Sequence, residues 1–438
     1  MGTGISRNPS RHPTVAWARV VQAIPASLLL AIPLVIMIGV TGLNYRLIGD
    51  EGVFHIKIVE GFAATWPRVN IANYRSASTP LSYLLMTAFG MLVGFEIWKL
   101  RLLSAIATFL SANVFYGICK RSGLPSPLLS SFTFLVFPYI FLFGFTIYPA
   151  AIALFFGMSA LSHYLRDDAT QVDLLKGSIL AGLAVLCRQS LLVIPAGMAI
   201  HELWQSYRDG LMTGSGRVIQ RLAILTIPLL MYAPLVFVWG GFTPAANRAS
   251  AGGEWFLRFT PAHLNYILIL VGFYFLPLLV SSHLRDLPRP GVAILVAGAI
   301  VLSIFLFFPV VLDEHPGQIQ YVGGLVARGL QTVKQALGAM SAVLAALALW
   351  IAGLAILLRE ATDRTGDPSR GKLASIAIIF VVLMIMSPFM YERYYVPLIP
   401  VLILMLHRYF RSTRLLSMWA AWQALLAAGF SYWHIAIK

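Results

Sequence analysis

The chain has 438 residues, of which 59% are hydrophobic and only 11% are charged, and its mean hydropathy is +0.80. This composition excludes an ordinary water-soluble protein and predicts a protein that lies in a membrane. The formal net charge is +15, but the basic residues gather in short segments between apolar runs. That pattern is typical of cytoplasmic loops facing anionic lipid, and we expect no nucleic-acid partner.

Long apolar runs recur along nearly the whole chain. Many have about 17–22 residues, enough to cross about 30 Å of hydrocarbon, and they are continuous rather than alternating, which favours helices over barrel strands. We therefore predict an all-α fold: a polytopic transmembrane helical bundle of about 13 spans, forming a single integral membrane domain over residues 1–438. The candidate spans are about 24–43, 80–98, 102–118, 127–147, 149–165, 174–187, 190–204, 220–240, 261–281, 291–312, 338–358, 373–389, 394–409 and 415–434.

Basic residues orient these spans, because short cytoplasmic loops are enriched in Lys and Arg. Residues 1–20 are predicted to be a basic cytoplasmic tail, and residues 44–79 an external loop long enough to hold short interfacial helices. Counting from the two ends of the chain disagrees by one span between residues 98 and 148. The other segments predicted to be external are 187–190, 241–260, 313–337 and 390–394.

The external loop begins with Asp50 and Glu51, followed by His55. On a helix that starts near residue 51, Glu51 and His55 share a face, and Asp50 lies at the N-terminus, where the helix dipole favours the ionised carboxylate. Such a carboxylate is suited to take a proton from an alcohol, so we predict a catalytic site at the membrane surface. The alternatives are helix capping by Asp50 or an ordinary solvated loop.

Arg188 and Gln189 lie at the joint between two apolar runs. An arginine there is costly without an anionic partner, and a phosphate at the bilayer surface matches its guanidinium group. The alternative is an ion pair with a carboxylate such as Glu51.

The segment Glu392, Arg393, Tyr394 and Tyr395 precedes another apolar run. Arg393 is predicted to be a second phosphate ligand. The tyrosines could stack on a sugar, although an interfacial aromatic belt is the simpler interpretation. 

Two further groups of polar residues lie in segments that could reach the same site. The run Asp313–Glu314–His315 matches no zinc spacing and is interpreted as a solvated loop, although a divalent metal stays possible. His263, Asn265 and Tyr266, at the start of another span, are further candidates for the site.

These segments together resemble the GT-C class of polytopic glycosyltransferases, and in particular the dolichyl-phosphate-glucose-dependent α-1,2-glucosyltransferase family. The resemblance is to short motifs in the same order along most of the chain. Tyr148-Pro149-Ala150 replaces the Tyr-Thr-Asp usual in that family, and Ser82 replaces a glycine, which leaves the sugar and the acceptor open. The matching segments are Asp50-Glu51 with Phe54-His55, Thr79-Pro80-Leu81-Ser82-Tyr83, Leu100-Arg101-Leu102-Leu103-Ser104, Arg188-Gln189-Ser190 and Glu392-Arg393-Tyr394-Tyr395.

The resemblance implies inverting transfer of a hexose, glucose favoured, from a polyprenyl-phosphate donor to a lipid-linked or envelope glycan acceptor. Asp50 would be the base, Glu51 would support it or take that role itself, and His55 would orient one of the two carboxylates. The enzyme would be a multi-pass protein, with the bacterial inner membrane favoured over an endoplasmic reticulum membrane, and its partners would be donor, acceptor and membrane lipids. A transporter or flippase of lipid-linked sugars is the alternative. The substrate-binding residues would be Arg75, Arg101, Arg188, Gln189, Glu392, Arg393, Tyr394 and Tyr395.

Overall fold

The computed structural model describes residues 14–166, 168–208, 210, 216–250, 259–277, 298, 321–362, 368–387, 389–406 and 412–437. Helices dominate this part of the chain, so the all-α prediction is confirmed. The α-helices are α1 (Thr14–Thr41), α2 (Ile56–Thr65), α3 (Leu81–Val93), α4 (Ile97–Arg121), α5 (Pro127–Leu135), α6 (Pro138–Phe143), α7 (Pro149–Tyr164), α8 (Gln171–Cys187), α9 (Val193–Arg208), α10 (Gly216–Leu225), α11 (Ile227–Trp239), α12 (Ala245–Ser250), α13 (Ala262–Tyr274), α15 (Leu325–Leu337), α16 (Ala339–Thr362), α17 (Pro368–Ile385), α18 (Leu398–Leu406) and α19 (Thr413–Tyr432).

Short irregular elements lie between these helices. The strands β1 (Tyr321–Gly323) and β2 (Phe389–Tyr391) pair in parallel. They bring the start of α15 beside the segment that precedes α18, across a long separation in sequence. The π-helical and 3₁₀-helical turns are η1 (Glu51–His55), η2 (Gln189–Leu192), η6 (Glu392–Tyr395) and η8 (Trp433–Ile437).

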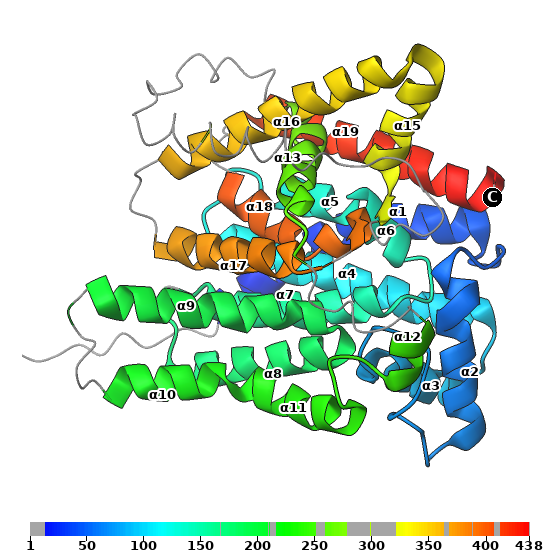
Figure 1. Cartoon of the computed structure of the whole chain (residues 1–438). Coiled ribbons are helices and arrows are strands. Elements are labelled where there is room, and N and C mark those ends of the chain that lie inside the picture. The colour runs from blue at the N-terminus through cyan, green and yellow to red at the C-terminus, as the bar shows by residue number, and fades with distance from the viewer. Residues whose placement is uncertain are drawn as a thin grey trace, which may run out of the picture.

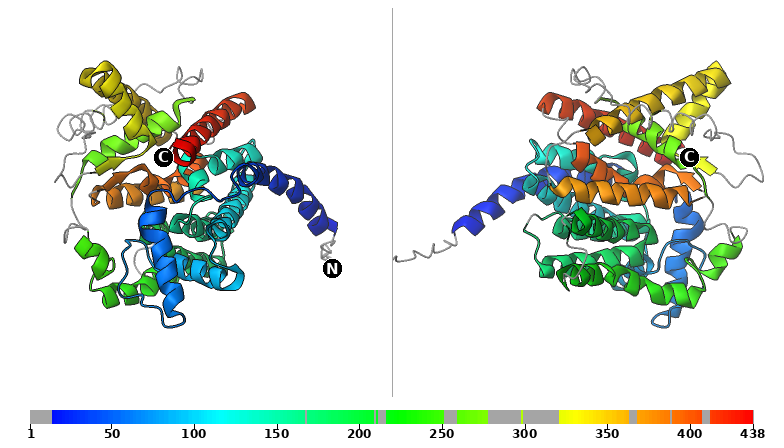
Figure 2. Two further views of the ribbon diagram at one scale, coloured as in Figure 1. Left: turned by 90° about the vertical axis from the view of Figure 1, so that its right-hand side faces the viewer. Right: turned by 60° about the vertical axis from the view of Figure 1, so that its left-hand side comes forward.

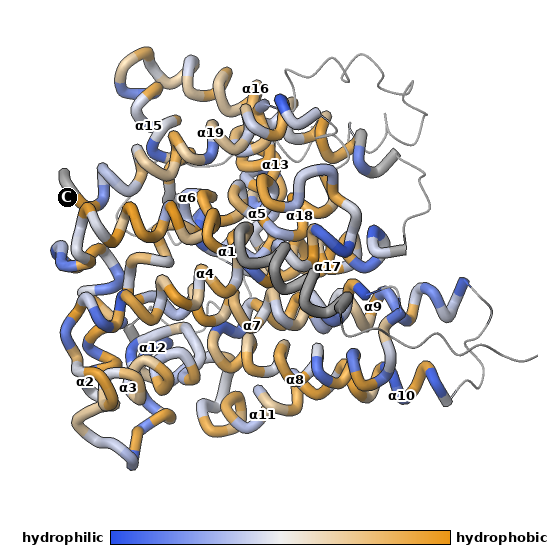
Figure 3. The backbone as a smooth tube through the Cα atoms, turned by 180° about the vertical axis from the view of Figure 1, so that it is seen from behind, coloured by the Kyte–Doolittle hydropathy of each residue, from blue (hydrophilic) through white to orange (hydrophobic). Residues whose placement is uncertain are grey.

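Long helices lying side by side form the body of the protein (Figure 1). Helix α7 packs against both α4 and α8, and α9 packs against α17. The N-terminal end of α1 extends out of this body (Figure 2). Apolar residues run along the helices and hydrophilic residues gather near many of their ends (Figure 3), the pattern expected of helices that bury their length in apolar surroundings.

Among the described residues, α4 and the Ala339–Leu358 part of α16 are each long and apolar enough to cross a membrane. Helices α10 and α11, bent by 43°, would make a third crossing if they act as one span. The total of about 13 spans therefore stays a prediction.

Prolines set several of the helix starts. Pro127, Pro138 and Pro149 stand in the first turns of α5, α6 and α7, where a missing N–H costs nothing. The predicted span at 127–147 is therefore two helices, because Pro138 cannot continue α5 and starts α6 instead.

Helix α3 accounts for the uncertain orientation of the spans near residue 98. Thr79, just before α3, donates a hydrogen bond of 2.7 Å to the carbonyl of Val185 at the end of α8. Arg101, one turn into α4, binds Glu51. Both flanks of α3 therefore lie at the same end of the bundle, where α3 lies beside α2 (Figure 1). The candidate span at 80–98 is corrected: this helix does not carry the chain to the opposite end.

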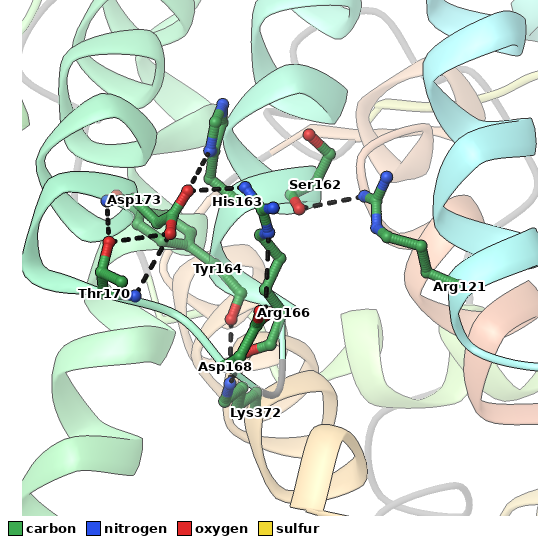
Figure 4. A network of polar contacts seen from close by, with 9 residues as sticks. All are labelled: Arg121, Ser162, His163, Tyr164, Arg166, Asp168, Thr170, Asp173 and Lys372. Carbon is green, nitrogen blue, oxygen red and sulfur yellow. Dashed lines mark hydrogen bonds and ion pairs between the residues drawn. The ribbon is translucent and has the colours of Figure 1, made fainter. Parts of the chain in front are cut away.

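A polar network links helix ends at the other end of the bundle, and Figure 4 shows its side chains from close by. Thr170 and Asp173 form a capping box at the start of α8, and Asp173 also accepts a hydrogen bond of 2.6 Å from Arg166. Lys372 at the start of α17 donates to the carbonyl of Tyr164 at 2.9 Å. These contacts hold together the C-terminal end of α7 and the N-terminal ends of α8 and α17. Arg166 and Lys372 supply the basic side chains of this network.

Candidate functional site

A cavity of about 210 Å³ lies at the end of the bundle opposite that basic network. Its walls come from segments far apart in sequence: the loop before η1, helix α6 and the turn after it, the β1–α15 junction, β2 with η6, and the end of α19. Its lining residues are Ile48, Gly49, Asp50, Tyr139, Leu142, Phe143, Thr146, Tyr148, Gly323, Gly324, Ala327, Arg328, Gln331, Tyr391, Arg393, Phe430 and His434.

Glu51 is buried in an ion pair with Arg101. The Arg101 Nε and Nη2 atoms lie 2.8 and 2.7 Å from the two carboxylate oxygens of Glu51. The backbone N–H groups of Ile147 and Ile48 donate to the same carboxylate at 2.8 and 3.0 Å. With four donors and 1% exposure, Glu51 joins the loop to α4 and to the turn before α7.

The rest of the Arg101 guanidinium group is also occupied. Its Nη1 atom donates to the carbonyl oxygens of Leu43 and Tyr45, at 2.9 and 2.8 Å. Its central carbon lies 3.7 Å from the centre of the Tyr45 ring. Arg101 is 0% exposed, so its position is that of an anchor for the loop rather than of a residue open to a phosphate.

Asp50 has a different environment from the adjacent Glu51. Its side chain is 28% exposed, lines the cavity, and forms an ion pair of 2.8 Å with the Nη1 atom of Arg393. Gly49, with φ of 50°, makes the turn that brings the carboxylate there. Asp50 precedes η1, but its side chain makes no capping hydrogen bond, so the capping alternative does not describe it.

His55 is buried at the end of η1. Its Nδ1 atom lies 2.7 Å from the hydroxyl of Tyr83, which is itself 2.8 Å from the hydroxyl of Ser76. Its ring packs edge-on against Tyr148, with the centroids 4.5 Å apart. Burial, reinforced by the charges of Arg393 and Arg188, lowers the pKa of His55 to about 3. The imidazole is therefore neutral at neutral pH.

Arg188 and Arg393 both lie near the ring of one tyrosine. The guanidinium carbons of Arg188 and Arg393 are 5.4 and 5.5 Å from the centre of the Tyr394 ring. Arg188 stands in extended conformation at the joint between α8 and η2. Within the described ranges no carboxylate pairs with Arg188, and Glu51 pairs with Arg101 instead. The structure thus brings together two cations that are 205 positions apart in the chain (393 minus 188).

Gln189 and Arg75 lie at the edge of this region. The Gln189 side-chain amide donates to the carbonyl of Ala77, which ties η2 to the external loop. Arg75 is exposed in that loop. 

Glu392 has different partners from the adjacent Arg393. Its carboxylate accepts hydrogen bonds from the hydroxyls of Tyr266 and Tyr274, at 3.0 and 2.7 Å, and from the backbone N–H groups of Val326 and Ala327. Burial raises the pKa of Glu392 above its usual range. These contacts clamp η6 onto the start of α15 and hold the neighbouring Arg393 in place.

Tyr395 is buried with His263. The tyrosine hydroxyl lies 2.5 Å from Nδ1 of His263, whose Nε2 atom is 2.7 Å from the carbonyl of Ser387. Asn265 accepts a hydrogen bond from the indole of Trp350. Tyr395, His263 and Asn265 are thus packed in the interior, apart from the cavity lining.

Sequence reasoning missed Arg328 and Thr146, which line the cavity, and treated Tyr148 only as part of a motif. Arg328 lies in the predicted external segment 313–337, where no local pattern distinguishes it. Asp313, Glu314 and His315 lie outside the described residues. Within the described ranges, no three His, Cys, Asp or Glu side chains cluster in a way that could hold a metal ion.

No protein-family model and no curated protein matches the chain. Solved structures that it resembles include ArnT from Cupriavidus metallidurans bound to undecaprenyl phosphate, at 15% identity and TM-score 0.48, over 94% of this chain and 64% of that chain. The same protein in the apo state gives 16% identity and TM-score 0.41, over 95% and 78%. The S. cerevisiae protein O-mannosyltransferase Pmt1-Pmt2 complex bound to the sugar donor is similar at 19% identity and a TM-score of 0.38. The match covers 54% of this chain and 36% of that chain.

This chain therefore spans less than two thirds of the ArnT chain in the undecaprenyl phosphate complex. Because every identity and TM-score is low, these similarities do not by themselves assign a fold family or a function.

Proposed function

We propose that the protein is a GT-C-type glycosyltransferase of the membrane that transfers a hexose, glucose favoured, from a polyprenyl-phosphate donor to a lipid-linked or envelope glycan on the external face, by inversion. The observation that carries the proposal is the contact between Asp50 and Arg393 at the cavity. It joins a partly exposed carboxylate to a cation that shares Tyr394 with Arg188. The site therefore combines a base with two phosphate ligands.

In the proposed reaction, Arg188 and Arg393, which both lie near the Tyr394 ring, hold the donor phosphate. The acceptor hydroxyl enters the cavity and attacks the anomeric carbon while Asp50 takes its proton. The bond from that carbon to the phosphate oxygen breaks, and its electron pair stays on the polyprenyl phosphate, whose negative charge the two arginines stabilise.

The neighbouring groups support these roles. Glu51 is held by four donors and is 1% exposed, which favours Asp50 rather than Glu51 as the base. His55 is neutral and buried, so it acts as a positioning residue for the wall formed by Tyr83 and Tyr148. Arg101 and Glu392 act on the site through the segments that they anchor, and Tyr395 does so through His263.

The test uses the full chain in nanodiscs, a panel of radiolabelled polyprenyl-phosphate sugars, and a membrane lipid extract as the source of acceptor. We expect transfer from one donor by the wild type and about a 10²–10⁴-fold loss in Asp50→Asn. The matched control is Glu60→Gln, which neutralises an exposed carboxylate of α2 and should retain activity. Full activity in Asp50→Asn would remove this base. If the donor instead crosses the membrane of liposomes that contain the protein, and no sugar is transferred to an acceptor, a transporter or flippase is favoured.

A further inference from the structure

Arg328 is the second arginine of the cavity lining, after Arg393, and lies on a different wall from Asp50. It lies in the first turn of α15, is partly buried, and lines the cavity together with Gln331, one turn further along the same helix. Arg328 and Gln331 are three residues apart and therefore share a helix face.

The backbone that carries Arg328 is fixed by its neighbours. The N–H group of Leu325 donates to the hydroxyl of Tyr139 at 3.0 Å, and those of Val326 and Ala327 donate to Glu392. Three consecutive N–H groups at this helix start thus have partners before the chain reaches Arg328. The arginine therefore stands on a rigid support rather than on a loose loop end.

The side chain of Arg328 is also held in place. Its guanidinium carbon lies 4.0 Å from the centre of the Trp433 ring in η8, a cation–π contact that holds the group against the ring. The Nη1 atom is buried, and among the residues that the structure describes it has no hydrogen-bond partner. A buried charged donor without a partner is costly, which points to an anion that occupies the place in the working complex.

We infer that Arg328, backed by Trp433, forms a subsite for a phosphate or carboxylate group carried by the acceptor. This inference rests on the proposed function. The lining of the cavity includes Asp50, Arg393 and Arg328, whereas Arg188 and Tyr394 lie beside Arg393 outside that lining. The donor phosphate is placed at Arg188 and Arg393, so the cavity that Asp50 lines receives the acceptor. Arg328, the second arginine of this cavity, then selects an acceptor that carries an acidic group.

The first experiment measures the binding of inorganic phosphate to the full chain in phosphatidylcholine nanodiscs. ³¹P NMR is used to detect the bound phosphate. The Arg188→Gln/Arg393→Gln double variant should keep one class of bound phosphate. Adding Arg328→Gln should weaken that remaining class about 10-fold to 100-fold, as expected for the loss of a charged hydrogen bond. Arg328→Lys should restore part of it, and Arg68→Gln, an exposed arginine of the external loop, is the control that should change nothing.

The second arm measures transfer with the lipid-extract acceptor. Arg328→Gln should raise the KM for acceptor about 10-fold or more, with the loss in KM rather than in kcat. Active enzyme with unchanged phosphate binding and unchanged acceptor KM in Arg328→Gln and Arg328→Lys would overturn the inference while the proposed function stands. Absence of transfer by the wild type would instead contradict the proposed function, and the phosphate titration still reports on Arg328.

The same titration separates an acceptor anion from a lipid headgroup. If phosphatidylglycerol added to the nanodiscs displaces the phosphate that depends on Arg328, the headgroup is the occupant and the acceptor assignment is wrong. Unchanged phosphate binding in those nanodiscs supports the acceptor. If Arg328→Gln and Arg328→Lys unfold at the same temperature as the wild type, misfolding does not cause their weaker phosphate binding or higher acceptor KM.

Discussion

The carboxylate of Asp50 lies 2.8 Å from the guanidinium Nη1 atom of Arg393, with 28% and 25% of the two side chains exposed. In the proposed reaction the donor phosphate needs the same guanidinium group. Phosphate and carboxylate therefore compete for Arg393, and the arrival of donor weakens the hold on the base. This relationship makes the proposed base and the proposed phosphate ligand interdependent.

The first prediction concerns donor binding in Asp50→Asn. Removing the carboxylate charge frees Arg393, so donor should bind about 1.4–5-fold more tightly although transfer is lost, since partly exposed pairs are worth only about 0.2–1 kcal/mol. Equilibrium binding of the labelled donor in nanodiscs measures this, with Glu60→Gln as the control. Weaker donor binding in Asp50→Asn than in Glu60→Gln would show that Asp50 does not compete for Arg393.

The second prediction separates Glu51 from Asp50 by stability. Glu51→Gln leaves the charge of Arg101 buried without its partner, and breaking such a pair costs about 3–5 kcal/mol. Thermal unfolding in nanodiscs should therefore show a large loss for Glu51→Gln and little change for Asp50→Asn. Glu96→Gln breaks an exposed pair with Lys99 and is the control, with no measurable change expected. Equal stability of Glu51→Gln and Asp50→Asn would contradict the difference in their environments.

The sequence predicts which segments meet, because the basic clusters place Asp50, Arg188 and Arg393 on the same side of the membrane, and the structure brings them together. It cannot tell Asp50 from Glu51. That difference depends on Arg101 and on the N–H group of Ile147, which lie 50 and 96 positions beyond Glu51. Local patterns do not encode such distant partners.

Hydropathy likewise fails at α3 and at Arg328. An apolar stretch is equally apolar whether it crosses a membrane or packs along one end of a bundle, so α3 is mistaken for a span. Arg328 becomes distinctive only when Trp433 and the cavity are in place, because its own segment reads as an ordinary basic helix.

The third prediction concerns pH. The pKa of His55 falls from 6.5 to about 3 on folding, so between these values the unfolded chain binds more protons than the folded one. Its contribution to stability is complete above about pH 6.5 and is lost as pH falls toward 3, by up to about 1.4 kcal/mol per pH unit. Unfolding measured at pH 7 and pH 5 should show a smaller loss for His55→Asn than for the wild type. Comparison of the two proteins cancels the contribution of the other histidines to the change in stability with pH. Equal losses of stability in His55→Asn and the wild type would mean that His55 is not buried in its neutral form.

The last prediction concerns the packing of α13 on α16. A Cβ atom added to Gly272 would collide with the carbonyl oxygen of Leu349, and one added to Gly353 would collide with that of Leu268. The two helices therefore approach through reciprocal glycines, as small residues allow in helical membrane proteins. Because backbone carbonyls cannot move aside as a flexible side chain can, Gly272→Ala should destabilise the protein by about 1–3 kcal/mol. Gly61→Ala, in open space within α2, should instead stabilise by about 0.5–1 kcal/mol through helix propensity. Thermal unfolding of both variants decides the matter, and a shift of the same sign in both would contradict the close contact between α13 and α16.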